Sequence, residues 1–364
     1  MASPKFPPLT GSAVIPPPRR SSLTHQQQQR LHQQSSGATT PALVKSPLSP
    51  LPAAVSSTAS TTTRPVPPSI KDFDIIKPIS KGAFGSVFLA KKRVTGDYYA
   101  IKFLKKSDMI AKNQVTNVKA ERMILMTQTD SPFVTKLYYT FQSKDYLYLV
   151  MEYLNGGDCS SLIKVLGTLP CDWARNYLAE VTLGLSYLHD RHIIHRDLKP
   201  DNLLIDQNGH LKLTDFGLSR IGFLDRRVRD ELKQAVGTPD YLAPESILGT
   251  GQDSMVDWWA LGVICYEFLY GYPPFHAETP DKVFENILSR NIDWHKDDIQ
   301  LPEEAYDFME RLLTLDPEQR LGRNGPEEVR QHPFFKDLDW DKLFTESPSF
   351  VPQPMNEEDT DYFD

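Results

Sequence analysis

Hydrophobic and polar positions divide the chain into an amino-terminal tail without a core pattern and a long patterned body. Residues 1–70 contain one aromatic, Phe6, and are crowded with Pro, Ser, Thr and Gln. Such a segment cannot bury enough apolar surface to offset the entropy lost on ordering, so we predict that it is disordered. Three readings stay open: a polyproline ligand at residues 16–18, a solvated linker, or a transit peptide, which the proline density disfavours.

The body begins near Phe73, and its pattern changes from strands to helices. Apolar stretches predict strands over residues 73–80, around 100–102 and over 146–153, and helical periodicity predicts helices over residues 115–127 and 173–190. The longest apolar run, 258–272, is interrupted by Glu267 and is too short and polar to cross a bilayer, so we interpret it as a buried core helix. We therefore predict an α+β fold with a small β-rich lobe at 73–153 and a large, mainly helical lobe at 154–335.

Charge and cysteine content narrow the class of protein. The first 70 residues hold six Lys or Arg and no acidic residue, whereas the rest holds 34 basic and 47 acidic residues, a balance of −13. An acidic body argues against a nucleic-acid partner. Because the apolar run 258–272 is too short and polar to cross a bilayer, we expect no membrane partner either. Three cysteines without paired spacing form no disulfide framework or metal motif, which suits a reducing compartment, the cytoplasm or the nucleus.

Two motifs carry the chemistry: HRDLKPDN at residues 195–202 and DFG at 215–217. Asp197 would accept or orient the proton of a substrate hydroxyl, and Lys199 would lie against a transferring γ-phosphate. Asn202 and Asp215 offer hard oxygen ligands suited to Mg²⁺. Either tripeptide alone fits a polar turn with a buried Asp. The two in this order, with Lys and Asn at these spacings, favour phosphoryl transfer from ATP.

A glycine-rich turn precedes these motifs, and its backbone N–H groups suit phosphates. No helix follows it, so the dinucleotide-binding and P-loop motifs do not apply. A kinase turn normally reads GxGxxG, and here a serine takes the place of the first glycine. The residues that we expect to contact nucleotide in this turn are Ile79, Ser80, Lys81, Gly82, Ala83, Phe84, Gly85, Ser86 and Val87.

A lysine and a glutamate are expected to pair behind this turn. Lys102, in the strand sequence AIK, would hold the α- and β-phosphates. Glu121 follows nineteen residues later on the predicted helix 115–127, where it would fix the lysine head group. A solvent-facing glutamate is the alternative.

The link after the strand 146–153 is the expected adenine contact. Backbone groups of Glu152 and Leu154 would pair with the base, and Asp158 would reach the ribose or a substrate arginine. The apolar residues expected around the purine, all equally compatible with ordinary core packing, are Val87, Ala100, Met151 and Leu204.

Three further predictions concern scaffolding. Asp257 should cap the backbone of the catalytic loop, and Arg320 should form an ion pair with Glu245. His189, His192 and His195 recur at intervals of three, but they cross a helix end into a loop. We therefore interpret His195 as a packed scaffold residue and not as a zinc ligand.

From Phe73 onward the sequence resembles the AGC group of protein Ser/Thr kinases. The sequences SFVP at residues 349–352 and DTDYFD at 359–364 are similar to the carboxy-terminal extension of that group, so residues 336–364 are expected to form it. The resemblance implies that Phe363 closes over the adenine site. PISKGAFG at 78–85 and GTPDYL at 237–242 resemble the Greatwall and MAST branch, including its fungal nutrient-signalling members.

Two departures from that branch affect the expected partners. Only 25 residues separate Gly217 from Ala243, where Greatwall relatives have a long insertion. The later motifs of an AGC tail do not occur before Asp364. We therefore expect either a partner that fills the groove on the small lobe or a truncated product.

The combined prediction is a monomeric protein Ser/Thr kinase that uses ATP and Mg²⁺. Asp158, Asp201 and Glu267 would form an acidic groove for arginines upstream of the acceptor. The Greatwall resemblance implies endosulfine-type phosphatase inhibitors as substrates, in cell-cycle or nutrient signalling. The alternatives are a pseudokinase that binds nucleotide or partners without turnover, and a scaffold that acts through the amino-terminal tail.

Overall fold

The computed structural model describes residues 68–82, 85–111, 115–128, 131–217, 219–221, 239–346 and 348–363. The prediction of disorder for residues 1–70 lies almost entirely outside this part of the chain. Ala83 and Phe84 of the predicted nucleotide turn lie outside it as well.

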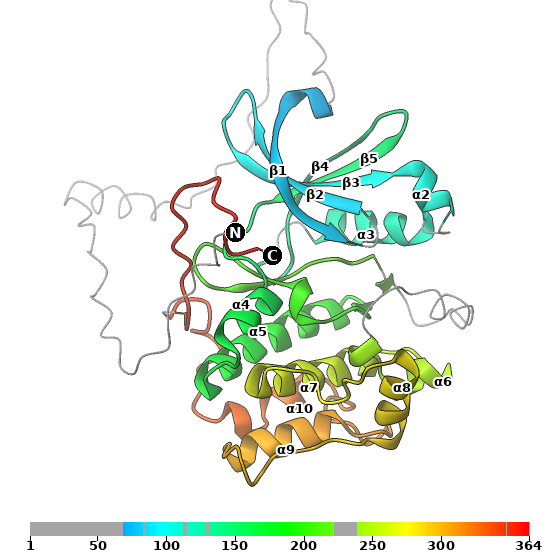
Figure 1. Cartoon of the computed structure of the whole chain (residues 1–364), viewed down its shortest axis with the longest axis vertical. Coiled ribbons are helices and arrows are strands. Elements are labelled where there is room, and N and C mark those ends of the chain that lie inside the picture. Colours follow the sequence, from blue (N-terminus) through cyan, green and yellow to red (C-terminus); the bar gives the residue numbers. More distant parts are fainter. Residues whose placement is uncertain are drawn as a thin grey trace, which may run out of the picture. The chain divides into compact units, whose positions relative to one another are not determined.

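The first part of the described chain is built on a five-stranded antiparallel sheet with the strand order β1-β2-β3-β5-β4 (Figure 1). Its strands are β1 (Phe73–Gly82), β2 (Gly85–Lys92), β3 (Tyr98–Lys105), β4 (Leu137–Gln142) and β5 (Tyr146–Glu152). Gly82 pairs with Gly85 in the last register position of the β1–β2 pair. The central strand β3 carries Lys102 between two paired neighbours, which fixes the direction of its side chain.

Two helices follow β3, α2 (Lys106–Ala111) and α3 (Val115–Thr127), and the bounds of α3 are the predicted ones. The buried residues of α3 are Asn117, Val118, Glu121, Ile124 and Leu125. Their spacing of three and four residues defines one face of a helix. Glu121 therefore lies on the inner face of α3 and not on its solvent face.

The second part of the described chain is mainly helical. Its helices are α4 (Cys159–Leu166), α5 (Cys171–His189), α6 (Pro244–Leu248), α7 (Met255–Tyr270), α8 (Pro280–Ser289), α9 (Glu303–Leu312) and α10 (Pro326–Arg330). Short strand pairs join β6 (Ile193–Ile194) to β9 (Arg220–Ile221) and β7 (Leu203–Ile205) to β8 (Leu211–Leu213). The predicted α+β fold, with a β-rich part followed by a helical part, is confirmed.

Helix α7 is the centre of the helical part, as the apolar run predicts. Every residue of α7 except Glu267 is buried. The helix ends at Gly271, whose φ of +88° is a left-handed conformation that glycine adopts without strain. No helix in the described residues is long and apolar enough to cross a membrane.

One apolar core joins the two parts of the fold. It extends from Val118 on α3 and Met151 on β5 to Leu185 on α5, Ile264 on α7 and Phe308 on α9. Burial of this surface is the main stabilising contribution, and it holds the residues that come from the sheet next to those that come from the helices.

The carboxy-terminal tail, which we define as residues 336–363, lies against both parts of the fold. The Tyr98 hydroxyl donates a hydrogen bond to Glu358 at 2.9 Å, and the Tyr153 hydroxyl donates one to the Asp359 carbonyl at 2.7 Å. Gly157 has a φ of +77°, and a Cβ there would collide with the Tyr362 backbone. The tail therefore approaches so closely that only glycine fits at this position.

Candidate active site

The catalytic loop, residues 195–202, is held in place by one buried carboxylate from α7. The backbone N–H groups of His195 and Arg196 donate to Asp257 at 2.9 and 2.8 Å. His189 lies 2.8 Å from the same carboxylate. Burial alone would raise the pKa of Asp257, but the hydrogen bond from His189 and the N–H donors hold that pKa below its usual value. The predicted capping role of Asp257 is confirmed.

His195 is packed inside the structure as predicted. Its side chain is fully buried, and its Nε2 lies 3.0 Å from the Thr214 carbonyl oxygen. Next to it, Arg196 has a φ of +68°, and Asp215 has a φ of +59°. Backbone strain of this kind at non-glycine residues persists only where the surroundings hold it, and it is concentrated at functional sites.

The loop brings together two predicted catalytic residues, Asp197 and Lys199, and the predicted metal ligand Asn202. The Asn202 side-chain amide donates to the Asp197 carbonyl at 2.6 Å and to its carboxylate at 3.1 Å. The Lys199 ammonium lies 3.3 Å from the same carboxylate. Burial raises the pKa of Asp197, the Lys199 charge opposes that rise, and the Asp215 charge adds to it. A carboxylate with a raised pKa is a better proton acceptor near neutral pH.

Lys102 joins the sheet, α3 and the DFG turn at one point. Its ammonium lies 2.7 Å from Glu121 and 3.2 Å from Asp215, so the structure contains the predicted Lys–Glu ion pair. Burial lowers the pKa of Lys102, but the two carboxylates outweigh it and keep the ammonium protonated. The same ammonium lowers the pKa of Asp215 against the effect of burial. Phosphate oxygens here would meet a fixed positive charge.

The donor set beside Lys102 fits Mg²⁺ shared with phosphates. The described residues hold no cluster of three or more His, Cys, Asp or Glu placed to bind a metal by themselves. Mg²⁺ is usually held by one or two protein oxygens plus water and substrate phosphates. Asp215 supplies an ionised carboxylate, and Asn202 supplies an amide oxygen, because its nitrogen already donates to Asp197. This set suits a metal that arrives with its nucleotide.

Of the residues predicted around nucleotide, Val87, Ala100 and Met151 lie beside Lys102 in the sheet by register. Val87 pairs with Lys102 across β2 and β3, and Ala100 pairs with Met151 across β3 and β5. Leu204 forms an isolated bridge with Asp158. Of the other predicted positions, Ile79 and Leu154 are buried, Ser80 and Lys81 are exposed, and Gly85 and Ser86 are partly buried.

Glu152, at the end of β5, has a role that sequence spacing did not indicate. Its carboxylate accepts hydrogen bonds from the Lys136 N–H at 2.7 Å and from the Lys212 ammonium at 2.8 Å. Its own N–H donates to the Lys136 carbonyl at 2.9 Å. This N–H is therefore not available to pair with a purine, and it drops out of the backbone contacts predicted for adenine. Lys212 lies 60 positions away on β8, so no local motif could reveal this link between the two parts of the fold.

Asp158 and Phe363 make contacts within the chain that the sequence did not predict. Asp158 is the N-cap of α4, and its carboxylate accepts from the Ser161 N–H at 2.8 Å and from the Ser161 hydroxyl at 3.0 Å. Any contact with ribose or arginine would have to share those oxygens. Phe363 stacks on Tyr153, with ring centroids 6.3 Å apart, so the tail reaches the link after β5.

Two acids of the predicted substrate groove influence one another. The Tyr241 hydroxyl donates a hydrogen bond to Glu267. The pKa of Glu267 is raised to about 7, mainly by burial; the hydrogen bond from Tyr241 opposes this rise, and the charges of Asp201 and Asp240 add to it. Asp201 is exposed at the surface of the catalytic loop. Glu267 is therefore fully ionised only above neutral pH.

The predicted ion pair between Arg320 and Glu245 is also present, and it is buried. The Arg320 guanidinium donates to both oxygens of Glu245, at 2.6 and 2.9 Å. It also donates to the carbonyls of Thr314 and Met255. This prediction is confirmed, and it anchors α6 to the helical core.

The fold and the cluster of Lys102, Asp197 and Asp215 together define one class of protein, the protein kinases. Comparison with known families agrees with this class. The family model described as "Protein kinase domain" matches residues 73–335, and the chain therefore belongs to this family.

Relatives with similar sequences are named as serine/threonine-protein kinases. The chain is 47% identical to cek1 of Schizosaccharomyces pombe over 82% of its length, and 44% identical to ppk18 of the same organism over 82%. It is 36% identical to RIM15 of Saccharomyces cerevisiae over 87% of its length. The chain spans only 29–31% of the length of these three relatives.

Proposed function

We propose that this chain transfers the γ-phosphate of MgATP to Ser or Thr hydroxyls of protein substrates. The observation that carries the proposal is that one buried ammonium, Lys102, contacts both Glu121 and Asp215. Lys102 would bind the α- and β-phosphates, and Asp215 and Asn202 would hold Mg²⁺, which neutralises charge on the phosphates. Asp197 would orient the acceptor hydroxyl, and Lys199 would stabilise the transferring group.

A pseudokinase is the alternative, and the chain gives it little support. The five side chains that the reaction needs are all in place: Lys102, Glu121, Asp197, Asn202 and Asp215. The serine in place of the first glycine of the nucleotide turn is the main feature in its favour. A scaffold role of the amino-terminal tail does not conflict with catalysis.

Removing the metal should separate these alternatives. We expect radiolabel transfer from ATP to an endosulfine-like protein and to a generic basic peptide in Mg²⁺, no transfer after chelation with EDTA, and recovery when Mg²⁺ is restored. Nucleotide binding in Mg²⁺ without transfer to either substrate would contradict the proposal and favour the pseudokinase.

We further propose that the kinase belongs to the AGC group and to its Greatwall-like branch. The similarity to cek1, ppk18 and RIM15 supports placing the chain with the fungal nutrient-signalling members of that branch. The position of Phe363 against Tyr153 supports an AGC-type tail. On this proposal endosulfine-type inhibitors are the substrates, and preferential phosphorylation of the endosulfine-like protein over the basic peptide is the test.

The acidic groove should make recognition of basic substrates depend on pH. Glu267 attracts an arginine only when ionised, and its pKa of about 7 places that change near neutral pH. We expect kcat/KM for a peptide with upstream arginines to rise as pH increases from 6 to 8, by about tenfold at most. Burial is the main cause of this raised pKa; Asp201 and Asp240 add to it, and Tyr241 and His276 oppose it.

A peptide without upstream arginines is the control for this prediction. Ionisation of Asp197 affects both peptides equally, so the ratio of their kcat/KM values isolates Glu267. Glu267→Gln should flatten that ratio across the same range. A ratio that stays constant with pH in the unmodified chain would show that Glu267 does not contact the substrate.

We propose that a protein partner docks on the small lobe and that the kinase itself is a monomer. Helices α2 and α3 expose Ile110, Met123 and Met126, which supply the apolar surface that such docking needs.

The three cysteines are free thiols, which supports the proposal that the kinase works in the cytoplasm or the nucleus.

A further inference from the structure

One ion pair, between Lys212 and Glu152, has no part in the proposed reaction but lies where the two parts of the fold meet. The Lys212 ammonium donates to both carboxylate oxygens of Glu152, each at 2.8 Å. The two side chains are only 18% and 17% exposed. Because both groups are largely shielded from water and the contact has two hydrogen bonds, the pair is better ordered than an exposed one. It therefore fixes the distance between the strands that carry its two members.

Lys212 shares a face of the β7–β8 pair with Leu204, one of the residues expected to contact the purine. The two residues are direct partners in the antiparallel register. Direct partners have their side chains on the same face of a strand pair. In both strands the middle residue is partly buried and its two neighbours are buried, so Leu204 and Lys212 form the less buried face. The Lys212 side chain therefore starts on the side of the β7–β8 pair where the purine is expected.

Glu152 ends the strand that is expected to form another wall of the purine site. Its neighbour Met151 pairs with Ala100 across β5 and β3, and both are expected around the purine. Leu154, whose backbone is expected to pair with the base, follows Glu152 by two residues. The ion pair therefore joins the β7–β8 wall of the expected site to the strand and the link that form its other wall.

Backbone hydrogen bonds turn this junction into a closed ring. Lys136, just before β4, accepts from the Glu152 N–H at 2.9 Å and donates its own N–H to the Glu152 carboxylate at 2.7 Å. Leu213, next to Lys212, accepts from the Thr135 N–H at 3.0 Å. The segment before β4 is therefore held by both β5 and β8, and the ion pair closes the ring between those two strands. Such a ring limits how far the end of β5 can move relative to β8.

The strand that carries Lys212 also leads to the phosphate end of the expected site. Asp215 follows Lys212 by three residues, and its carboxylate lies 3.2 Å from the Lys102 ammonium. A nucleotide would place its phosphates beside Asp215 and its base beside the link after β5. The ion pair thus relates the two ends of one ligand to a single strand. Such placement matters, because an error of about 1 Å in the position of a bound reactant can cost a factor of about 10² in rate.

We propose that Lys212 is a positioning residue for the nucleotide base. Through Glu152 it holds the link after β5 at the separation from Leu204 that fits a purine. This inference rests on the proposed kinase function. Because Lys212 does not touch the reacting atoms, its loss should weaken nucleotide binding more than it slows the transfer step. The alternative is that the backbone hydrogen bonds alone fix the junction and that the ion pair only adds stability.

The Kd for MgATP, measured by isothermal titration calorimetry on the full chain, tests this role of Lys212. Lys212→Met keeps an unbranched side chain but removes the ammonium, and we expect it to raise Kd by about fivefold to thirtyfold. The KM for ATP should rise with Kd, whereas kcat at saturating MgATP should change by less than about threefold. Lys212→Arg keeps two N–H donors for the carboxylate and should recover most of the affinity.

Further comparisons separate positioning from stability. Adding Glu152→Gln to Lys212→Met removes the unpaired carboxylate charge, so Tm should recover while the Kd for MgATP stays high. Purine riboside triphosphate lacks the 6-amino group of ATP and has fewer base contacts to lose, so Lys212→Met should weaken its binding less than that of ATP. Lys282→Met is the matched control, because Lys282 forms an exposed ion pair with Glu285 on α8, and its Kd and kcat should not change.

Three results would overturn the positioning role of Lys212. They are an unchanged Kd in Lys212→Met, equal losses of affinity for the two nucleotides, and recovery of Kd together with Tm in the double variant. Binding of MgATP without phosphate transfer by the unmodified chain would contradict the proposed kinase function alone, because Kd would still decide the role of Lys212. No binding of MgATP by the unmodified chain would overturn both.

Discussion

Replacing Asp197 with Asn should lower kcat by about 10²- to 10⁴-fold, because general-base assistance contributes a factor of that size. Asn keeps the shape of the side chain and can still accept the hydrogen bond from Asn202, which is 3.1 Å long. It cannot take a proton from a substrate hydroxyl. Phosphate transfer measured at saturating MgATP and peptide would show the loss, whereas the Kd for nucleotide should change little.

A matched control for this variant is Asp145→Asn. Asp145 is exposed in the turn between β4 and β5, and only its backbone carbonyl takes part in a described hydrogen bond. It carries the same chemical change at a site without catalytic geometry, so its kcat should match that of the unmodified chain. Equal kcat values for the two variants would exclude Asp197 as the base.

Replacing Arg320 with Met should destabilise the chain by about 3–5 kcal/mol, the usual cost of leaving a buried charge without its partner. The Arg320 side chain has no exposed surface, and that of Glu245 is 7% exposed. Loss of the Arg320 guanidinium also leaves the Thr314 and Met255 carbonyls without their hydrogen-bond donor. Urea unfolding at pH 7 would measure the change as a lower midpoint.

The neighbouring Arg323 supplies the control for this prediction. It pairs with Asp253 at 3.3 Å and with Glu318 at 2.7 Å, but its side chain is 37% exposed. Exposed pairs contribute about 0–1 kcal/mol, so Arg323→Met should have a small effect. Adding Glu245→Gln to Arg320→Met should recover part of the loss, because no unpaired charge then remains. Similar midpoints for Arg320→Met and Arg323→Met would refute the argument.

Sequence reasoning succeeded where local pattern and chemistry determine structure together. Helical periodicity predicted the bounds of α3, and the separation of nineteen residues from Lys102 favoured the inward, paired position of Glu121. The strongly apolar run of α7 could only be a buried helix, and its one interrupting residue, Glu267, is the one that is not buried. The predicted roles of Asp257, as the cap of the catalytic loop, and of Arg320, as the partner of Glu245, are the ones that the structure shows.

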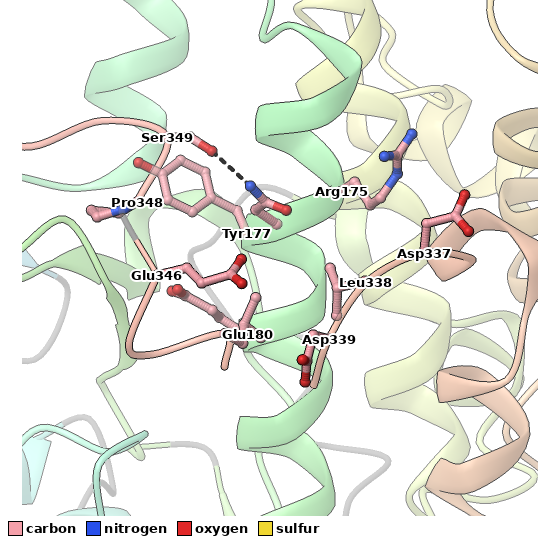
Figure 2. Close-up of a pocket in the computed structure, with 11 residues that line it drawn as sticks. Arg175, Tyr177, Glu180, Asp337, Leu338, Asp339, Glu346, Pro348 and Ser349 are labelled. Carbon is pink, nitrogen blue, oxygen red and sulfur yellow. Dashed lines mark hydrogen bonds between the residues drawn. The ribbon is translucent and has the colours of Figure 1, made fainter. Parts of the chain in front are cut away.

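The contacts that the sequence could not reveal join segments that are far apart in the chain. Glu152 binds Lys212 across 60 positions, and neither residue belongs to a local motif. A polar cavity between α5 and the tail (Figure 2) exists only where these two segments meet, so the residues that line it look like ordinary surface residues in the sequence. Asp158 matched a substrate-binding position by type, but aspartate is also one of the residues favoured at a helix N-cap, which is the position it occupies.

The glycines under the tail bear on the order of folding. A Cβ at Gly157 would collide with the Tyr362 backbone, and one at Gly209 would collide with the Phe350 backbone. Gly157 lies in the link after β5 and Gly209 in the β7–β8 turn, so the tail can pack on these glycines only after the link and the turn have formed. Contacts between such distant segments require closure of a long loop, so the kinase domain should form first and the tail should dock last. An ordered tail would then report that the domain beneath it has folded.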